Sequence, residues 1–217
     1  MKFAIVGAAC VALSAAAAGA ATIQFNEDRG WTNGSLDYSN GHDSVAVSAY
    51  EYFNYTAGLL HSGSTTYVAS VSGPEGGVNA WSCNWHHWCS DDESLVDGSY
   101  GNEMVVFDFG NRVVELTGVT LANADRHDYF DIVVYNNGLG RAPTDGLLDR
   151  PVADYSPQFI SISSLDTGSV FGVGAYRHGS EFAIQAIHFE VVPLPAAGWL
   201  LLAGVGGLAV LKRRKKA

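Results

Sequence analysis

The chain has 217 residues, of which 47% are hydrophobic and 16% are charged, and it carries a formal net charge of −10. The part from residue 21 to residue 192 holds all 22 acidic residues together with six arginines and no lysine, so its own formal charge is −16. A field of this sign repels nucleic acid and anionic lipid head groups. It therefore excludes nucleic-acid binding and favours divalent cations or basic partners.

The N-terminus has the parts of a secretory signal peptide in their usual order. Lys2 is followed by an apolar stretch over residues 3–18 and by the small-residue exit Ala18-Gly19-Ala20. We therefore expect residues 1–20 to be a signal peptide that is cleaved at this exit. A lipoprotein signal that uses Cys10 is one alternative, but the residues before this cysteine lack the usual Leu. An uncleaved anchor is another, and it would not need the cleavage site.

Between the two ends, short segments rich in Val, Ile, Tyr and Phe alternate with clusters of Gly, Asn, Asp and Ser, a pattern typical of strands and turns. The predicted strands are residues 22–25, 44–52, 66–72, 103–109, 112–121, 129–135, 158–163, 169–176 and 181–192. No segment has a sustained helical period. The sequence therefore predicts one all-β domain over residues 21–192, an antiparallel β-sandwich of jelly-roll-like type.

Two stretches are predicted as loops, residues 58–65 and the unusually long stretch 73–102. The second contains three of the five tryptophans of the chain, Trp81, Trp85 and Trp88. Exposed rings on such a loop would form a platform for stacking against sugar rings or a partner surface. The alternative, which we favour, is that the rings fold down as a cap over one end of the domain.

The same loop contains the two cysteines that remain after export, because Cys10 would leave with the signal peptide. Cys83 and Cys89 would face an oxidising compartment, and five residues between them are enough to close a ring, so we expect a disulfide. Zinc binding by these cysteines with His86 and His87 is the alternative. The spacing fits none of the usual Cys/His finger patterns.

Carboxylates gather at two places where a calcium ion would find oxygen ligands. Asp125, Asp128 and Asp131 lie at a predicted turn that enters a strand, and Asp91 and Asp92 lie in the tryptophan loop. Neither group has the spaced Asp, Asn and Gly of an EF-hand loop. A hydrated acidic turn is the simpler interpretation of both, and calcium is the cofactor that they would otherwise bind.

The C-terminus has the features of a membrane span with a cytoplasmic basic end. No charged residue lies between Glu190 and Lys212, and the run over residues 196–211 is apolar throughout. A helix needs about 20 such residues to cross the hydrocarbon core of a bilayer. The five basic residues 212–216 would stay on the cytoplasmic side, which leaves the preceding domain outside.

The motif Val192-Pro193-Leu194-Pro195-Ala196, followed by this span and basic cluster, resembles a PEP-CTERM-type sorting signal in its VPLPA variant. Leu194 stands where the commoner form has Glu, which leaves the identity of the processing enzyme open. The resemblance implies that an exosortase-like membrane protease cuts near the motif, at the inner membrane of a Gram-negative bacterium, and passes the domain to the cell surface or the medium. An ordinary anchor is the alternative, and it would need no Pro-Leu-Pro.

The pattern of residues 103–110, 113–119 and 128–132 also resembles that of some exosortase-sorted surface proteins. Residues 193–217 would thus be the sorting signal of an exported, disulfide-containing surface or matrix protein. The chain has neither HExxH nor GxSxG, so we expect a structural or adhesive role and no enzymatic activity. One alternative is a glycan-binding module that uses the three loop tryptophans on an extracellular polysaccharide. Another is a polysaccharide hydrolase, which would need two carboxylates about 5–10 Å apart in a cleft.

Overall fold

The computed structural model describes residues 19–53, 59–61, 65–71, 76–83, 95–98, 102–136, 139, 143–152, 157–163, 165–175 and 177–193. Within these ranges, nothing is said of the side chains of residues 52, 53, 59–61, 65, 71, 82 and 83. Gly19–Val192 form one compact unit. Residues 1–18 of the expected signal peptide and the sorting signal from Leu194 onward lie outside the described residues, while Ala20, the last residue of the expected signal peptide, is the first residue of a strand.

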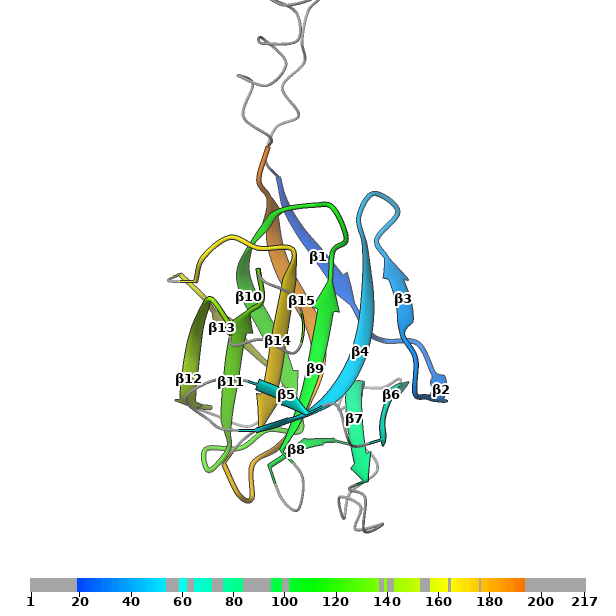
Figure 1. The fold of residues 1–217 in the computed structure, drawn as a ribbon, viewed down its shortest axis with the longest axis vertical. Coiled ribbons are helices and arrows are strands. Elements are labelled where there is room, and N and C mark those ends of the chain that lie inside the picture. Colours follow the sequence, from blue (N-terminus) through cyan, green and yellow to red (C-terminus); the bar gives the residue numbers. More distant parts are fainter. Residues whose placement is uncertain are drawn as a thin grey trace, which may run out of the picture. The chain divides into compact units, whose positions relative to one another are not determined.

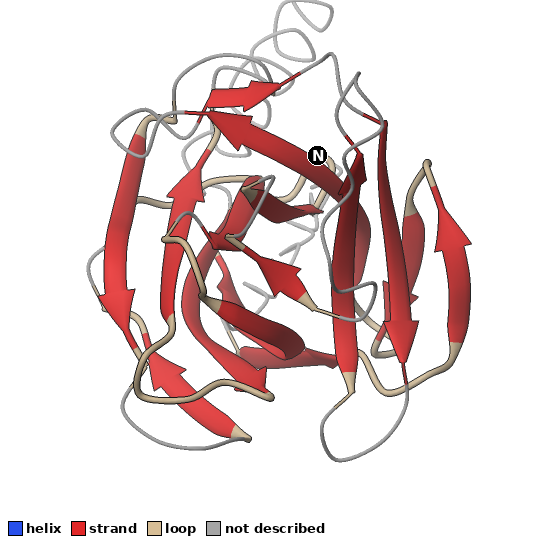
Figure 2. Cartoon of the chain, turned by 90° about the horizontal axis from the view of Figure 1, so that it is seen from below, coloured by secondary structure: helices blue, strands red, loops and turns tan. Residues whose placement is uncertain are grey.

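The described part of the chain is all-β, with two antiparallel sheets and no helix (Figures 1 and 2). The eight-stranded sheet contains β1 (Ala20–Gln24), β2 (Arg29–Thr32), β6 (Thr65–Val71), β7 (Gly77–Cys83), β8 (Val96–Asp97), β10 (Val114–Ala122), β13 (Gln158–Ser161) and β15 (Glu181–Val191). The seven-stranded sheet contains β3 (Leu36–Ser39), β4 (Ser44–Phe53), β5 (Leu59–His61), β9 (Glu103–Asp108), β11 (Tyr129–Val134), β12 (Asp145–Pro151) and β14 (Val170–Ala175). None of the described elements is a helix that could span a membrane.

The last strand of the domain organises the eight-stranded sheet. β15 pairs with β10 along one side, and with β1, β7 and β8 along the other. Figure 1 shows β1, β15 and β10 side by side. The order in the other sheet is β12-β11-β14-β9-β4-β3. Among the described strands, β1 therefore pairs only with β15 and β3 only with β4, so each has one free edge.

The hydrophobic core lies between the two sheets. In β4 the residues Val45, Val47 and Ala49 are buried, as the alternation of apolar and polar residues predicts for a strand with one inner face. Aromatic rings from opposite sides meet in this core. Phe25 stacks on Phe107 with 5.5 Å between ring centroids, and comparable edge contacts join other rings. The two sheets thus share one core.

All nine predicted strands are present, with ends that differ by at most two residues. The prediction of a continuous loop over residues 73–102 is wrong, because β7 and β8 lie within it, and the predicted loop 58–65 likewise contains β5. β7 is buried over Gly77–Ala80, so its sequence lacks the alternation of a half-exposed strand. A Cβ on Gly77 would lie 2.5 Å from the carbonyl oxygen of Ile184, so only glycine fits there.

Candidate functional site

A polar cleft of about 480 Å³ lies where the free edge of β1 meets β2 and β3. It brings together strands from both sheets, because β1 and β2 belong to the eight-stranded sheet and β3 to the other. The residues that line it are Thr22, Gln24, Asn26, Glu27, Arg29, Asp37, Tyr38, Ser39 and Asn40. None of them was a candidate in the sequence.

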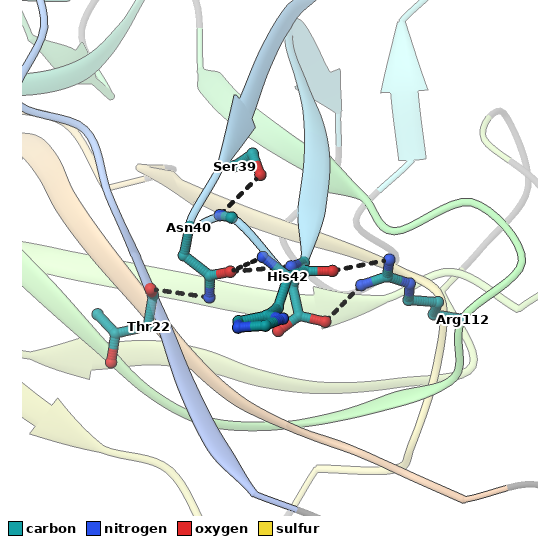
Figure 3. Close-up of polar contacts among 7 residues, drawn as sticks. Thr22, Ser39, Asn40, His42 and Arg112 are labelled. Atoms are coloured by element: carbon teal, nitrogen blue, oxygen red, sulfur yellow. Dashed lines mark hydrogen bonds and ion pairs between the residues drawn. The ribbon is translucent and has the colours of Figure 1, made fainter. Parts of the chain in front are cut away.

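The turn between β3 and β4 forms one end of this cleft and is closed by the side chain of Asn40 (Figure 3). Its Oδ1 accepts hydrogen bonds from the N–H groups of His42 and Asp43, at 3.0 and 2.8 Å. Gly41 has a φ of 92°, which the primed hairpin turns require and which favours glycine. Its N–H donates to Ser39 Oγ at 3.0 Å. The Asn-Gly pair therefore fixes the turn locally.

The same turn is tied to its surroundings on two sides. Asn40 Nδ2 donates to the carbonyl oxygen of Thr22 on β1 at 3.3 Å, across the gap between the sheets. On the other side, Arg112 donates to the carbonyl oxygen of His42 at 3.2 Å and forms an ion pair with Asp43. Figure 3 shows these contacts converging on the turn. The β3–β4 turn is thus held between β1 and the segment that precedes β10.

Arg29 supplies the positive charge of the cleft. Its Nε and Nη2 both donate to Glu27 Oε2, at 3.1 and 2.7 Å, and its Nη1 donates to the carbonyl oxygen of Asp37 at 2.9 Å. The guanidinium also lies 4.5 Å from the centre of the Tyr38 ring. The hydrogen bond with Glu27 is the main cause that raises the pKa of Arg29. The positive charge of Arg29 is therefore paired with Glu27. Asp37 is the second ionisable carboxylate that lines the cleft.

Three aromatic residues form a second candidate site on the outer face of the eight-stranded sheet. Trp81 lies 5.3 Å from Tyr67 and 6.1 Å from Trp31, measured between ring centroids. Trp31 is 38% exposed, while Trp81 is partly buried. The Nε1 of Trp81 is buried and has no hydrogen-bond partner among the described residues. We call Trp31, Tyr67 and Trp81 the aromatic cluster.

A third arrangement on the eight-stranded sheet surrounds His188. Its Nδ1 lies 2.9 Å from Thr22 Oγ1 and its Nε2 lies 2.9 Å from Thr120 Oγ1. Phe159, which is 56% exposed, contacts the imidazole edge to face, with 4.9 Å between centroids. A Cβ on Gly118 would lie 2.4 Å from the Phe159 ring, so the ring rests on a glycine. Burial lowers the pKa of His188.

The carboxylates at residues 125, 128 and 131, the calcium candidates of the sequence, accept hydrogen bonds from backbone amides. Asp128 is only 5% exposed, and its two oxygens accept hydrogen bonds from the N–H of Asp125 at 2.5 Å and of Glu181 at 3.0 Å. Burial is the main cause that raises the pKa of Asp128. Asp125 Oδ1 accepts from the N–H of His127 at 2.6 Å, and Asp131 Oδ1 from that of Asp149 at 2.5 Å. These groups hold the turn and its neighbouring strands.

Within the described ranges, no three His, Cys, Asp or Glu side chains are grouped so that they could hold a metal ion. Several of the candidate site residues named from the sequence lie outside these ranges. The described residues do not include Trp85, Trp88, Cys89, Asp91, Asp92 or the side chain of Cys83. The expected disulfide and two of the three loop tryptophans therefore stay predictions. Trp81, the third, lies on β7 within the aromatic cluster and not on a loop.

Comparison with protein families, with curated proteins and with solved structures gives no match for this chain. The support for the candidate sites is therefore the geometry and chemistry of this chain's own residues. Of those that sequence reasoning missed, only the Asn40-Gly41 pair carries a local signal, since this dipeptide before an alternating segment is typical of a hairpin turn. Arg29 and Trp31 lie in a segment for which no strand is predicted. Phe159 lies in the predicted strand 158–163, but only pairing of the strands brings these three side chains to a site.

Proposed function

We propose that the chain is an exported cell-surface or extracellular-matrix protein with a non-enzymatic, structural or adhesive role. The observation that carries this proposal is the sequence of its C-terminal segment, in which the Pro motif at 192–196 precedes an apolar run and a basic cluster. An exosortase-like protease is the expected processing partner, and the inner membrane of a Gram-negative bacterium is the intermediate location.

The way in which the folded domain ends supports processing at this motif. β15 ends at Val191, and the N–H of Val192 donates to the carbonyl oxygen of Val113 at 2.9 Å. Pro193 follows, is exposed and has no N–H with which to extend a strand. A protease that acts beyond Val192 would therefore leave the whole of β15 in place.

We also infer that the two sheets form a β-sandwich with jelly-roll-like connections. The shared core supports the first part, because residues of both sheets pack within it. The chain passes from one sheet to the other between β9 and β10, between β10 and β11, and between β14 and β15. Such crossings are typical of the Greek-key and jelly-roll folds. A domain of this kind would serve as a rigid carrier for surface groups.

The use of buried carboxylates supports a non-enzymatic role. Glu103 is fully buried, and its Oε2 accepts a hydrogen bond from the N–H of Asp97 at 3.2 Å. Asp128 and Asp131 bind backbone amides in the same way. Carboxylates that act in glycoside hydrolysis face a cleft and change protonation during the reaction. Here these three groups stabilise loops and strand ends, and the two carboxylates that line the cleft are Glu27, which is bonded to Arg29, and Asp37.

Intact-mass measurement of protein extracted from the cell surface tests the sorting proposal. We expect a chain that begins near Ala21 and lacks the residues beyond the Pro motif. A variant with Pro193→Ala and Pro195→Ala should keep the basic residues 212–216 and remain in the inner membrane, whereas Pro157→Ala, an exposed proline outside the motif, should be processed normally. Retention of residues 212–216 in the wild-type protein would indicate an ordinary anchor.

A second candidate function is glycan binding by the aromatic cluster. The specific observation is that Trp81 lies beside Tyr67 and the exposed Trp31, so the cluster offers ring surface at the outside of the sheet. Sugar rings stack on such surfaces through their apolar faces. We expect Trp31→Ala to abolish retention on immobilised neutral polysaccharides while the melting temperature stays within about 2 °C. Phe159→Ala, which removes an exposed ring elsewhere, is the matched control.

A further inference from the structure

The cleft between β1, β2 and β3 is bordered by the edge of β1 that pairs with no other described strand. The N–H of Phe25 donates to the carbonyl oxygen of Gln185 at 2.9 Å, so Phe25 faces β15 with its backbone groups. In an antiparallel pair, successive residues direct these groups alternately toward the partner strand and away from it. Thr22 and Gln24 therefore direct theirs toward the cleft. The bond from Asn40 Nδ2 to the Thr22 oxygen agrees with this direction.

β3 presents a second set of backbone groups from the opposite side. The N–H of Asn40 donates to the carbonyl oxygen of Asp43 at 3.1 Å, which closes the pairing with β4 at this residue. By the same alternation, Asp37 and Ser39 direct their backbone groups away from β4. Arg29 Nη1 accordingly reaches the Asp37 oxygen. The free edges of β1 and β3 thus both face the cleft, and they are not paired with each other.

The side chains at the mouth add polar groups that suit hydroxyl ligands. Gln24, Asn26 and Asp37 are exposed, line the cleft and make no side-chain hydrogen bond with other described residues. Amides donate and accept, and a carboxylate accepts with two oxygens, so together they match the paired hydroxyls of a sugar. A volume of about 480 Å³ lies toward the small end of the range of about 300–1,000 Å³ for ligand pockets.

Charge decides which sugars fit. The guanidinium of Arg29 is hydrogen-bonded to Glu27 and also interacts electrostatically with Asp37, so one positive charge in the lining faces two carboxylates. The domain as a whole carries a formal charge of −16. Uronic acids and sulfated or phosphorylated sugars would be repelled, whereas hydroxyl groups would find both donors and acceptors.

We propose that this cleft binds a short neutral saccharide of one or two rings, held by Gln24, Asn26 and Asp37 and by backbone groups of β1 and β3 other than the carbonyl oxygens of Thr22 and Asp37, which bind Asn40 and Arg29. Its biological use rests on the proposed surface role, because binding here would give an adhesive protein its ligand. The cleft is separate from the aromatic cluster. The register of β2 shifts between Arg29 and Thr32, so that Arg29 lies over Tyr38 in the cleft while Trp31 lies against Trp81.

The test is amide NMR on the full chain in a detergent that contains no sugar, with cellobiose, maltose and glucuronic acid as probes. We expect cellobiose or maltose at millimolar concentration to shift the backbone amides of Thr22, Gln24 and Ser39 and the side-chain amide of Asn40. Glucuronic acid should leave them unchanged. Asp37→Ala should weaken the binding about tenfold, and Asp37→Asn should weaken it less because it keeps one acceptor oxygen.

Asp166→Ala, a change of an exposed carboxylate outside the cleft, is the control and should bind as the wild type does. The proposal is wrong if neither disaccharide shifts these amides, if glucuronic acid binds equally well, or if Asp166→Ala weakens the binding as much as Asp37→Ala does. Circular dichroism of each variant shows whether it is folded. If Asp37→Ala does not fold, the comparison of Asp37→Asn with the wild type still tests the proposal. Failure of the sorting proposal would appear in the mass of the surface protein and would not change these shifts.

Discussion

Asn40 lies in the turn between two strands of the seven-stranded sheet, and its side-chain amide donates to the carbonyl oxygen of Thr22, on β1 of the eight-stranded sheet, at 3.3 Å. The same side chain closes its own turn through Oδ1. One asparagine therefore performs two tasks, since it fixes the β3–β4 hairpin and occupies a free backbone oxygen at the edge of β1. Occupied edges are less able to pair with another chain.

Replacing Asn40 separates these two tasks. Asn40→Ala removes all three hydrogen bonds of the side chain and should lower the free energy of unfolding by about 2 kcal/mol. Asn40→Asp keeps the acceptor for the N–H groups of His42 and Asp43 but removes the donor to Thr22, so it should cost less. Urea unfolding followed by tryptophan fluorescence measures both. An aspartate variant that is as unstable as the alanine variant would mean that repulsion between the new carboxylate oxygen and the Thr22 carbonyl oxygen offsets the two turn bonds.

Asp128 should make the stability of the domain depend on pH. Burial raises its pKa in the folded state above the unfolded value. Its contribution is therefore fully present below the unfolded pKa and is lost as the pH rises through the folded pKa. The stability of the wild type relative to Asp128→Asn should increase when the pH is lowered from neutral toward the usual aspartate range. Unfolding curves of both proteins at several pH values measure this difference, and a constant difference would contradict it.

His188 should give a pH dependence of opposite sign. Burial lowers its pKa in the folded state, so its contribution is present above the unfolded pKa of about 6.5 and is lost as the pH falls through the folded pKa. The stability of the wild type relative to His188→Gln should therefore be smaller at pH 5 than at pH 8. Melting temperatures at the two pH values provide the comparison. Equal differences at both would show that the imidazole is equally solvated in both states.

Gly77 marks the close approach of β7 to β15. Its Cβ position lies 2.5 Å from the carbonyl oxygen of Ile184, and backbone atoms cannot move aside as a flexible side chain can. Gly77→Ala should therefore cost about 3 kcal/mol. Gly30→Ala, where a Cβ would meet nothing within 4 Å, should change stability by less than about 1 kcal/mol. Similar effects of the two changes would mean that β7 does not pack against β15.

Calcium should stabilise this acidic domain through general charge neutralisation. With a formal charge of −16 and no lysine, the domain repels itself, and cations screen that repulsion. We expect millimolar calcium and a higher concentration of sodium to raise the melting temperature to a similar extent, and Asp128→Asn to leave the effect unchanged. Saturation at low calcium, with no effect of sodium, would instead reveal a dedicated site.

Local pattern was enough to predict β4, which has one inner face, and β9, which is buried on both faces. Both strands carry β-branched and aromatic residues, which pack on a pleated surface whatever their neighbours are. β7 was missed for a physical reason: glycine and asparagine have low strand propensity, and Gly77 is there because β15 approaches closely. This requirement is set by a strand about a hundred residues away in the sequence, so no local window contains it.

The cleft and the aromatic cluster were unpredictable for the same kind of reason. Trp81 was singled out together with its sequence neighbours, yet its contacts are Tyr67, across a strand pair, and Trp31, on a third strand. In β2, alternation alone would place Arg29 and Trp31 on one face, and the shift in register sends them to different sites. The pairing partners and the register of the strands determine these sites, and neither can be predicted from the sequence of a single segment.

The pairing of β15 with both β1 and β10 also determines how the domain would carry a mechanical load. A tether attached beyond Val192 would pull β15 along its own axis, so that the ladders on both of its sides are loaded in shear together. Bonds loaded in this way must break nearly at once, whereas bonds at a peeled edge break one after another. A surface protein held by this end would therefore resist flow or traction with its first and last strands before any other part of the fold yields.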